Sequence, residues 1–303
     1  MIQQIITNTP IVLLISTFSL IWVFLFAVRK HYRLKNLRLP FTETLLRSPG
    51  QSLLKKIDFL NQEITIYAVY LFLFPIFLHA TYISHLYFNK RIPSLLGLLI
   101  LCALAMGLLV YSLYKLTVYL RQRRLLRLGY DGEVAVGQQL NQLLRDGYHV
   151  YHDFPADKFN IDHIVVGKKG IFAVETKARS KPNSDRRKED ATVEYNGKVL
   201  HFPKWTDTET IAQAERQSSW LSKWIGSAIG EPVVARGIVA LPGWYVNRTS
   251  SDGIPVVNPK QFTSLFKQIK PRDLSEEMIK RIVHQLEQKC RDVEPTSNIT
   301  EQG

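Results

Sequence analysis

The stretch NIDHIVVGKKGIFAVETKA, residues 160–178, decides the fold. Its two halves, 160–167 and 171–178, are rich in β-branched and other apolar residues, which favour strands. The dipeptide Lys168-Lys169 and Gly170 separate them, and such a short polar, glycine-containing link is typical of a tight turn. The stretch therefore predicts two neighbouring antiparallel strands.

Three charged residues interrupt these otherwise apolar strands: Asp162 in the first, and Glu175 and Lys177 in the second. Alternate residues of a strand share a face, so Glu175 and Lys177 are expected on one side, with Asp162 on a nearby rung. Burying such groups together is costly unless they are compensated. Two interpretations stay open. One is a structural ion pair of Lys177 with one acid. The other is a divalent cation between the two acids, with Lys177 near an attacking water.

The sequence around this hairpin predicts a layered α/β or α+β fold built on a central mixed sheet. Asn196-Gly197 is a strong signal for a second hairpin. Periodicity and turn residues predict helices at 132–145, 209–225, 260–268 and 275–289, and further strands at 148–152, 192–195, 198–202, 233–241 and 254–257.

The charge of the chain is distributed unevenly. The 303 residues carry a formal net charge of +13, yet residues 1–120 hold 11 basic and only three acidic side chains. The same region contains three long uncharged apolar stretches, at about 11–28, 64–88 and 92–114, each long enough to cross a bilayer as a helix. The sequence therefore predicts three transmembrane helices, and it excludes a single soluble globule and a uniformly basic nucleic-acid coat.

Basic residues flanking the apolar stretches predict the topology. The loop 29–63 holds eight Lys or Arg residues and should be cytoplasmic, whereas the uncharged N-terminus should lie outside. Residues 51–63 of this loop suit either an amphipathic helix on the inner leaflet or simple linkage. We expect a multi-pass protein of the cell (inner or plasma) membrane, in contact with the lipid bilayer. It comprises a membrane domain (1–120), a cytoplasmic domain (121–293) and a disordered tail (294–303).

The two cysteines, Cys102 and Cys290, lie far apart in segments of different character. This spacing excludes a disulfide framework and a cysteine zinc site.

The pattern of Glu133, Asp162-His163, Gly170 to Lys177 and Gln213-Ala214 resembles the NERD (nuclease-related) domain, over about residues 129–245. That family is assigned to the PD-(D/E)xK nuclease superfamily, so the resemblance implies a restriction-endonuclease-like core. It implies Asp162 and Glu175 as ligands of Mg²⁺ (or Mn²⁺) and Lys177 as the catalytic lysine. It also implies supporting roles for Glu133 and Gln213.

Two of these residues also have simpler interpretations. Glu133 is expected in the first turn of its helix, where the helix dipole alone favours a carboxylate. Gln213 would also suit an ordinary polar position on a helix.

The segment 179–190 follows the proposed site and is rich in basic residues, namely Arg179, Lys181, Arg186, Arg187 and Lys188. It would suit contacts with a phosphate backbone or simply a solvated surface, since three acidic residues are interspersed. The sequence thus predicts a membrane-anchored metal-dependent nuclease acting on DNA, with RNA left open. The alternative is a catalytically inactive, membrane-tethered nucleic-acid-binding or scaffold module. The oligomeric state is not indicated.

Overall fold

The computed structural model describes residues 16–17, 19–28, 30, 43–89, 94–181, 191–272 and 274–295. The chain divides into two compact units, one of residues 46–291 and one that combines residues 1–45 with 292–303. The larger unit contains two long helices and all the residues of the predicted site. The short strands β1 (Leu45–Leu46) and β11 (Arg291–Val293) lie at the boundaries of the two units.

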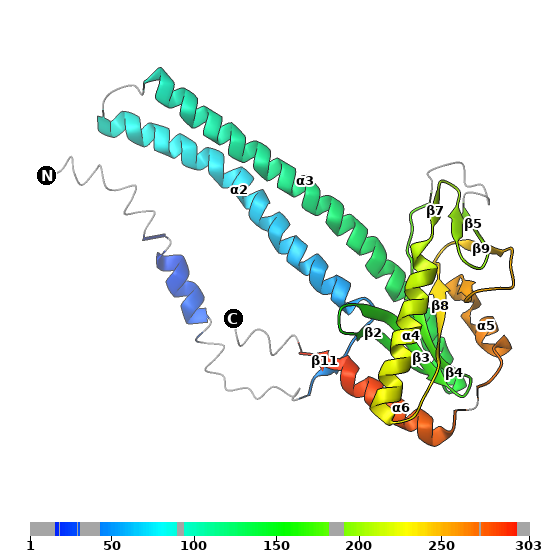
Figure 1. Cartoon of the computed structure of the whole chain (residues 1–303). Coiled ribbons are helices and arrows are strands. Elements are labelled where there is room, and N and C mark those ends of the chain that lie inside the picture. Colours follow the sequence, from blue (N-terminus) through cyan, green and yellow to red (C-terminus); the bar gives the residue numbers. More distant parts are fainter. Residues whose placement is uncertain are drawn as a thin grey trace. The chain divides into compact units, whose positions relative to one another are not determined.

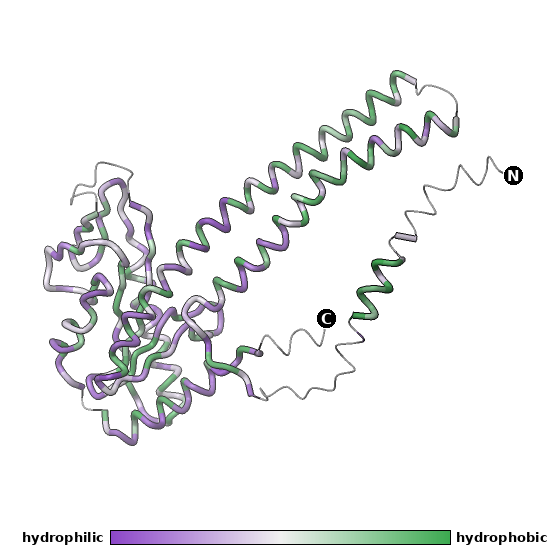
Figure 2. Tube along the Cα trace, turned by 180° about the vertical axis from the view of Figure 1, so that it is seen from behind, coloured by the Kyte–Doolittle hydropathy of each residue, from purple (hydrophilic) through white to green (hydrophobic). Residues whose placement is uncertain are grey.

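Two long helices run antiparallel to each other, α2 (Gln51–Asn89) and α3 (Leu95–Leu140) (Figure 1). Apolar residues predominate in the C-terminal half of α2 and the N-terminal half of α3 (Figure 2). Both helices are long and apolar enough to cross a membrane, judged by length and composition alone.

The prediction of three membrane-spanning helices is not matched by the described residues, which contain two helices of sufficient length. The first predicted span, 11–28, contributes only a short apolar helix, Ser19–Val28, and its residues 11–15 and 18 lie outside the described residues. Residues 29 and 31–42 of the basic loop 29–63, and residues 90–93, also lie outside them.

Helices that we expected to be separate are continuous. Residues 51–63 and the second apolar stretch form one helix, α2. The third apolar stretch, the basic residues after it and the helix expected from Gly132 form another, α3. The basic segment between them consists mainly of leucine and arginine, which are strong helix formers. Single glycines such as Gly129 and Gly132 cost a helix only about 1 kcal/mol each. No residue in this segment is therefore able to end the helix.

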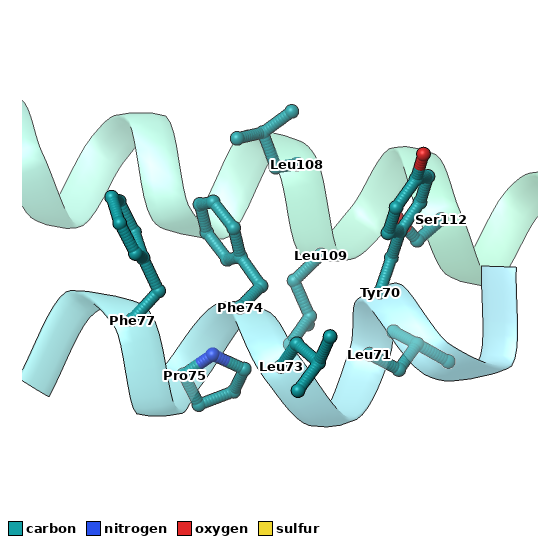
Figure 3. Close-up of a pocket in the computed structure, with 9 residues that line it drawn as sticks. All are labelled: Tyr70, Leu71, Leu73, Phe74, Pro75, Phe77, Leu108, Leu109 and Ser112. Carbon is teal, nitrogen blue, oxygen red and sulfur yellow. The ribbon is translucent and has the colours of Figure 1, made fainter. Parts of the chain in front are cut away.

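A cavity of about 420 Å³ lies between the apolar halves of α2 and α3. Phe74 and Pro75 line it from α2, and Leu108 and Ser112 line it from α3 (Figure 3). Apart from the Tyr70 and Ser112 side chains, its lining residues are apolar.

A five-stranded mixed sheet forms the centre of the larger unit, which confirms the predicted mixed sheet. Strands β2, β3 and β4 are antiparallel neighbours, and β4, β8 and β10 are parallel neighbours. The strand order is β10 (Val256–Val257), β8 (Ala235–Ala240), β4 (Gly170–Thr176), β3 (Asn160–Gly167) and β2 (His149–Pro155).

Helices pack on both faces of this sheet. One face contacts α4 (Glu209–Ile229) and α6 (Glu276–Cys290), through a core that includes Leu221 and Ile282. The other face contacts the C-terminal end of α3, η1 (Asn141–Asp146) and α5 (Phe262–Gln268). Both faces of β4 are therefore covered, and a charged residue in β4 needs partners inside the fold.

A four-stranded sheet, ordered β7 (Trp205–Asp207), β6 (Leu200–Phe202), β5 (Thr192–Tyr195) and β9 (Tyr245–Arg248), forms beside the first. Its β5–β6 hairpin turns at Asn196-Gly197, as predicted. Asn196 Oδ1 accepts the Lys198 and Val199 N–H groups, and Gly197 has a φ of 96°. A short helix, η3 (Pro259–Gln261), precedes α5. Residues 296–303 of the predicted tail lie outside the described residues.

Candidate active site

The β3–β4 hairpin brings Asp162 and Glu175 to the same end of the sheet. The paired residues run from Gly167 opposite Gly170 to His163 opposite Val174, and Asp162 and Glu175 each follow one residue beyond the last pair. The Thr176 N–H donates to Asp162 Oδ2 at 2.7 Å. The structure therefore brings together the two acids that the sequence placed on nearby rungs.

Glu175 is a buried charged residue at this end, with 2% of its surface exposed. Its Oε1 lies 2.6 Å from Lys177 Nζ and accepts Gln213 Nε2 at 2.9 Å. Its Oε2 accepts Gln217 Nε2 at 2.6 Å. Three donors, one from the residue that follows β4 and two from α4, thus hold one carboxylate, which compensates much of the cost of burying it.

The prediction of a strand over 171–178 included Lys177. In the structure β4 ends at Thr176, and Lys177 is the residue that follows it. Its backbone N–H donates to Ala240 O at 3.0 Å, which keeps this part of the chain beside β8. Its ammonium group also donates to Gln213 Oε1 at 3.0 Å. Gln213 therefore bridges Lys177 and Glu175, and the ammonium lies in a fixed place next to the carboxylates.

Glu133 approaches the site from α3. The sequence suggested a position in the first turn of a helix, but Glu133 lies near the C-terminal end of a 46-residue helix. A favourable interaction with the helix dipole therefore does not explain a carboxylate at this position. It is 8% exposed, and its Oε2 has no hydrogen-bond partner. Burial, followed by the nearby Asp153 and Glu175 carboxylates, raises the pKa of Glu133 to about 7, against the opposing effect of the Gly50 N–H and of Lys177.

The site contains more acidic than basic side chains. Burial raises the pKa of Asp162 well above its ordinary value, and the neighbouring Glu175 and Glu133 carboxylates raise it further. Lys177 is the cation that acts on both Asp162 and Glu133. With three carboxyl groups and one ammonium group, a further cation would stabilise the charged forms of the acids.

The donor set can be compared with what a divalent cation needs. Within the described ranges, no group of three or more His, Cys, Asp or Glu side chains is arranged to hold a metal ion. Mg²⁺ commonly binds only one or two carboxylates and completes its shell with water and substrate oxygens. Asp162 and Glu175 satisfy that smaller requirement, and the unpartnered Glu133 Oε2 is a buried acceptor beside them. The residues fit Mg²⁺ or Mn²⁺ on these grounds.

The expected nucleic-acid contacts are only partly described. Arg179 Nη2 lies 3.3 Å from Asp207 Oδ2, and Asp207 accepts the Glu209 and Thr210 N–H groups at the start of α4. Lys181 Nζ lies 6.0 Å from the centre of the Trp244 ring. The remaining three basic residues, Arg186, Arg187 and Lys188, lie outside the described residues.

Sequence reasoning missed two residues that contact this site. Gln217 holds Glu175 Oε2, and its position four residues after Gln213 on α4 places both amides on one helix face. That spacing could have identified it. Asp153 acts electrostatically on Glu133 from a bend in β2, and nothing in the local sequence marked it.

The arrangement defines a class of α/β protein in which a buried Glu-x-Lys pair and an aspartate meet at the end of a mixed sheet. In a comparison with known families, residues 128–242 match the family described as the nuclease-related domain, NERD. The match confirms a nuclease-related domain in this part of the chain. Neither the curated proteins nor the solved structures include a match to this chain.

Proposed function

We propose that the chain is a metal-dependent nuclease that hydrolyses phosphodiester bonds in DNA. The observation that carries this proposal is the cluster of Glu133, Asp162 and Glu175 around Lys177, inside a domain that matches a nuclease-related family. Such a family suggests nucleic acid as the partner in general terms, and DNA is our choice within that class.

Each residue of the cluster has a role that follows from its contacts. Asp162 and Glu175 would hold Mg²⁺ or Mn²⁺, which when bound supplies a Lewis acid and lowers the pKa of coordinated water. Lys177 would orient the attacking water and stabilise negative charge on the phosphate, because Glu175 and Gln213 fix its ammonium group in place. Gln213 and Gln217 hold the Glu175 carboxylate in one orientation.

The substrate would approach across the basic residues that follow the site. Arg179 pairs with Asp207, which precedes α4, and Lys181 lies over the Trp244 ring. We propose that these residues contact the phosphate backbone together with Arg186, Arg187 and Lys188. We also propose that α2 and α3 anchor the domain in the cell membrane, with the nuclease-related domain on the cytoplasmic side.

The test uses the purified full chain in detergent with Mg²⁺ or Mn²⁺ and labelled single-stranded, double-stranded and branched DNA. We expect cleavage that EDTA abolishes and that the Glu175→Ala and Lys177→Ala variants lose. The exposed ion pair between Arg281 of α6 and Glu231, which follows α4, offers a control, since Arg281→Ala should leave cleavage unchanged. Absence of cleavage by the wild type, or undiminished cleavage by the two variants, rejects the proposal.

A second candidate function is a membrane-tethered binding or scaffold module without turnover. The observation that favours it is that Glu175 already has donors on both oxygens, as expected of a structural ion pair. Calorimetric titration with Mn²⁺ separates the two. A nuclease must bind the ion and lose that binding in Asp162→Asn, whereas a scaffold of this kind shows no binding at these acids.

A further inference from the structure

The Arg47–Ser52 turn, in which α2 begins, packs closely against the part of α3 that carries Glu133. A Cβ added at Gly137 would lie 2.6 Å from Pro49 Cγ, a distance too short for any side chain. Gly50 has a φ of 69°, and a Cβ there would lie 2.7 Å from Tyr130 Cδ2. Glycine is thus required on both sides of this contact.

Asp153 fastens this turn to β2. The Arg47 Nη1 group donates to Asp153 O and Oδ2, both at 3.0 Å. Ser52 donates its backbone N–H to Oδ2 at 2.9 Å and its hydroxyl to Oδ1 at 2.6 Å. The Asp153 side chain is 2% exposed and that of Arg47 13%, so this ion pair is shielded from water.

The fastened turn touches the candidate site at two places. The Gly50 N–H lies close enough to the Glu133 carboxyl group to oppose the rise in its pKa. Asn160 Nδ2 donates to Asp153 Oδ1 at 3.0 Å, and Asn160 begins β3 two residues before Asp162. One buried aspartate therefore joins the start of α2 to the strand that carries a proposed metal ligand.

We propose that the Arg47–Ser52 turn is a positioning element of the active site, which holds the part of α3 that carries Glu133 through its packing against Tyr130 and Gly137 and is itself held by Asp153. This inference rests on the proposed function and names a segment outside residues 128–242 that the function requires. Because α2 begins in this turn and α3 carries Glu133, the packing of α2 against α3 at this turn determines the position of Glu133 in the site.

The expected effect follows from the sensitivity of catalysis to position. Displacing a supporting carboxylate by about 1 Å costs roughly 100-fold in rate, with little effect on groups that only bind substrate. Arg47→Ala should therefore lower kcat about 10- to 100-fold and leave KM within about threefold of wild type. Arg47→Lys keeps a cation within reach of Asp153 and should restore most of the lost kcat.

The experiment compares the full chain in detergent with the variants Arg47→Ala, Arg47→Lys and Gly50→Ala. Arg281→Ala removes a solvent-exposed ion pair between α6 and Glu231 and serves as the matched control. Hydrogen exchange of the segment 128–140, measured by mass spectrometry, reports the seating of Glu133 independently of activity. We expect faster exchange there in Arg47→Ala and Gly50→Ala, and no change in the control. If Arg47→Ala does not fold, Ser52→Ala, which loses one hydroxyl bond to Asp153, takes its place.

The outcomes separate the two proposals. A wild type that cleaves while the Arg47 and Gly50 variants keep its kcat overturns the inference and leaves the proposed function intact. A wild type that cleaves nothing rejects the proposed function, and hydrogen exchange alone then decides the inference. Unchanged exchange of 128–140 in the variants overturns it.

Discussion

Glu133 is a buried carboxyl group whose pKa is raised to about 7 because burial and the Asp153 and Glu175 carboxylates disfavour its charge. A carboxyl group with a raised folded-state pKa stabilises the fold while it is protonated, and that contribution is lost as the pH rises towards 7. The charged Glu133 therefore lowers the free energy of unfolding at pH 8 in metal-free buffer. Asp162 acts in the same direction.

Glu133→Gln should raise the free energy of unfolding at pH 8, in EDTA, by about 1–3 kcal/mol and change it little at pH 4. Tryptophan fluorescence during urea denaturation of the full chain measures both values. Glu194→Gln, at an exposed residue of β5, is the control and should show no difference between the two pH values. A stabilisation of equal size at pH 4 would show that the charge of Glu133 is not its cause.

The main site residues could be predicted from the sequence because the evidence for them is local. Asp162 and Glu175 interrupt two apolar strands joined by a short polar turn, and Lys177 follows the second strand, so their proximity followed from hairpin geometry. Two other pairs could not be predicted, because their members lie far apart in the sequence. Asp153 and its partner Ser52 are about 100 residues apart, and Gly50 and Glu133 are about 80 residues apart. No periodicity within one element reports such a contact.

At the scale of elements, α3 combines an apolar helix with the helix that carries Glu133. The sequence boundary that we expected at Gly132 reflects packing, not a helix start. A Cβ at Gly132 would lie 2.6 Å from Ala178 Cβ, so the glycine allows α3 to approach the chain that follows β4. Sequence periodicity identified the helical segments correctly but not their continuity, since glycine serves both helix ends and close contacts.

Two glycines of the same helix offer a matched pair of substitutions. Gly132→Ala should lower the free energy of unfolding of the larger unit by about 1–3 kcal/mol, because the added methyl group meets Ala178. Gly107→Ala should be tolerated to within about 1 kcal/mol, because nothing lies within 4 Å of its added Cβ. Urea denaturation of both variants in detergent measures the difference. Equal effects would contradict the close contact at Gly132.

At the scale of the whole molecule, the two cysteines report on different parts of the chain. Cys102 lies on the surface of the apolar half of α3, whereas Cys290 is 1% exposed at the end of α6. If α2 and α3 cross a bilayer, lipid shields Cys102 and the fold shields Cys290.

Neither cysteine should therefore react with a charged, membrane-impermeant maleimide in sealed vesicles, and both should react in sodium dodecyl sulfate. Ser251→Cys, at an exposed position of the larger unit, is the positive control and should react in inside-out vesicles only. Mass spectrometry of the labelled chain reads out each site. Rapid labelling of Cys102 in intact vesicles would contradict a membrane-spanning α3.

The proposed activity is tested most directly by cleaving DNA with the full chain and Mg²⁺ in water enriched in ¹⁸O. Hydrolysis forms a bond from a water oxygen to phosphorus and breaks one ester bond, so each cleaved linkage should yield a terminal phosphate that carries one ¹⁸O atom. We expect this label with the wild type and its loss with Glu175→Gln, in samples of both that circular dichroism shows to be folded at the assay temperature. Unlabelled or uncleaved DNA with the wild type, or equal labelling with the variant, would contradict the assignment of a hydrolytic site to Glu175 and its neighbours.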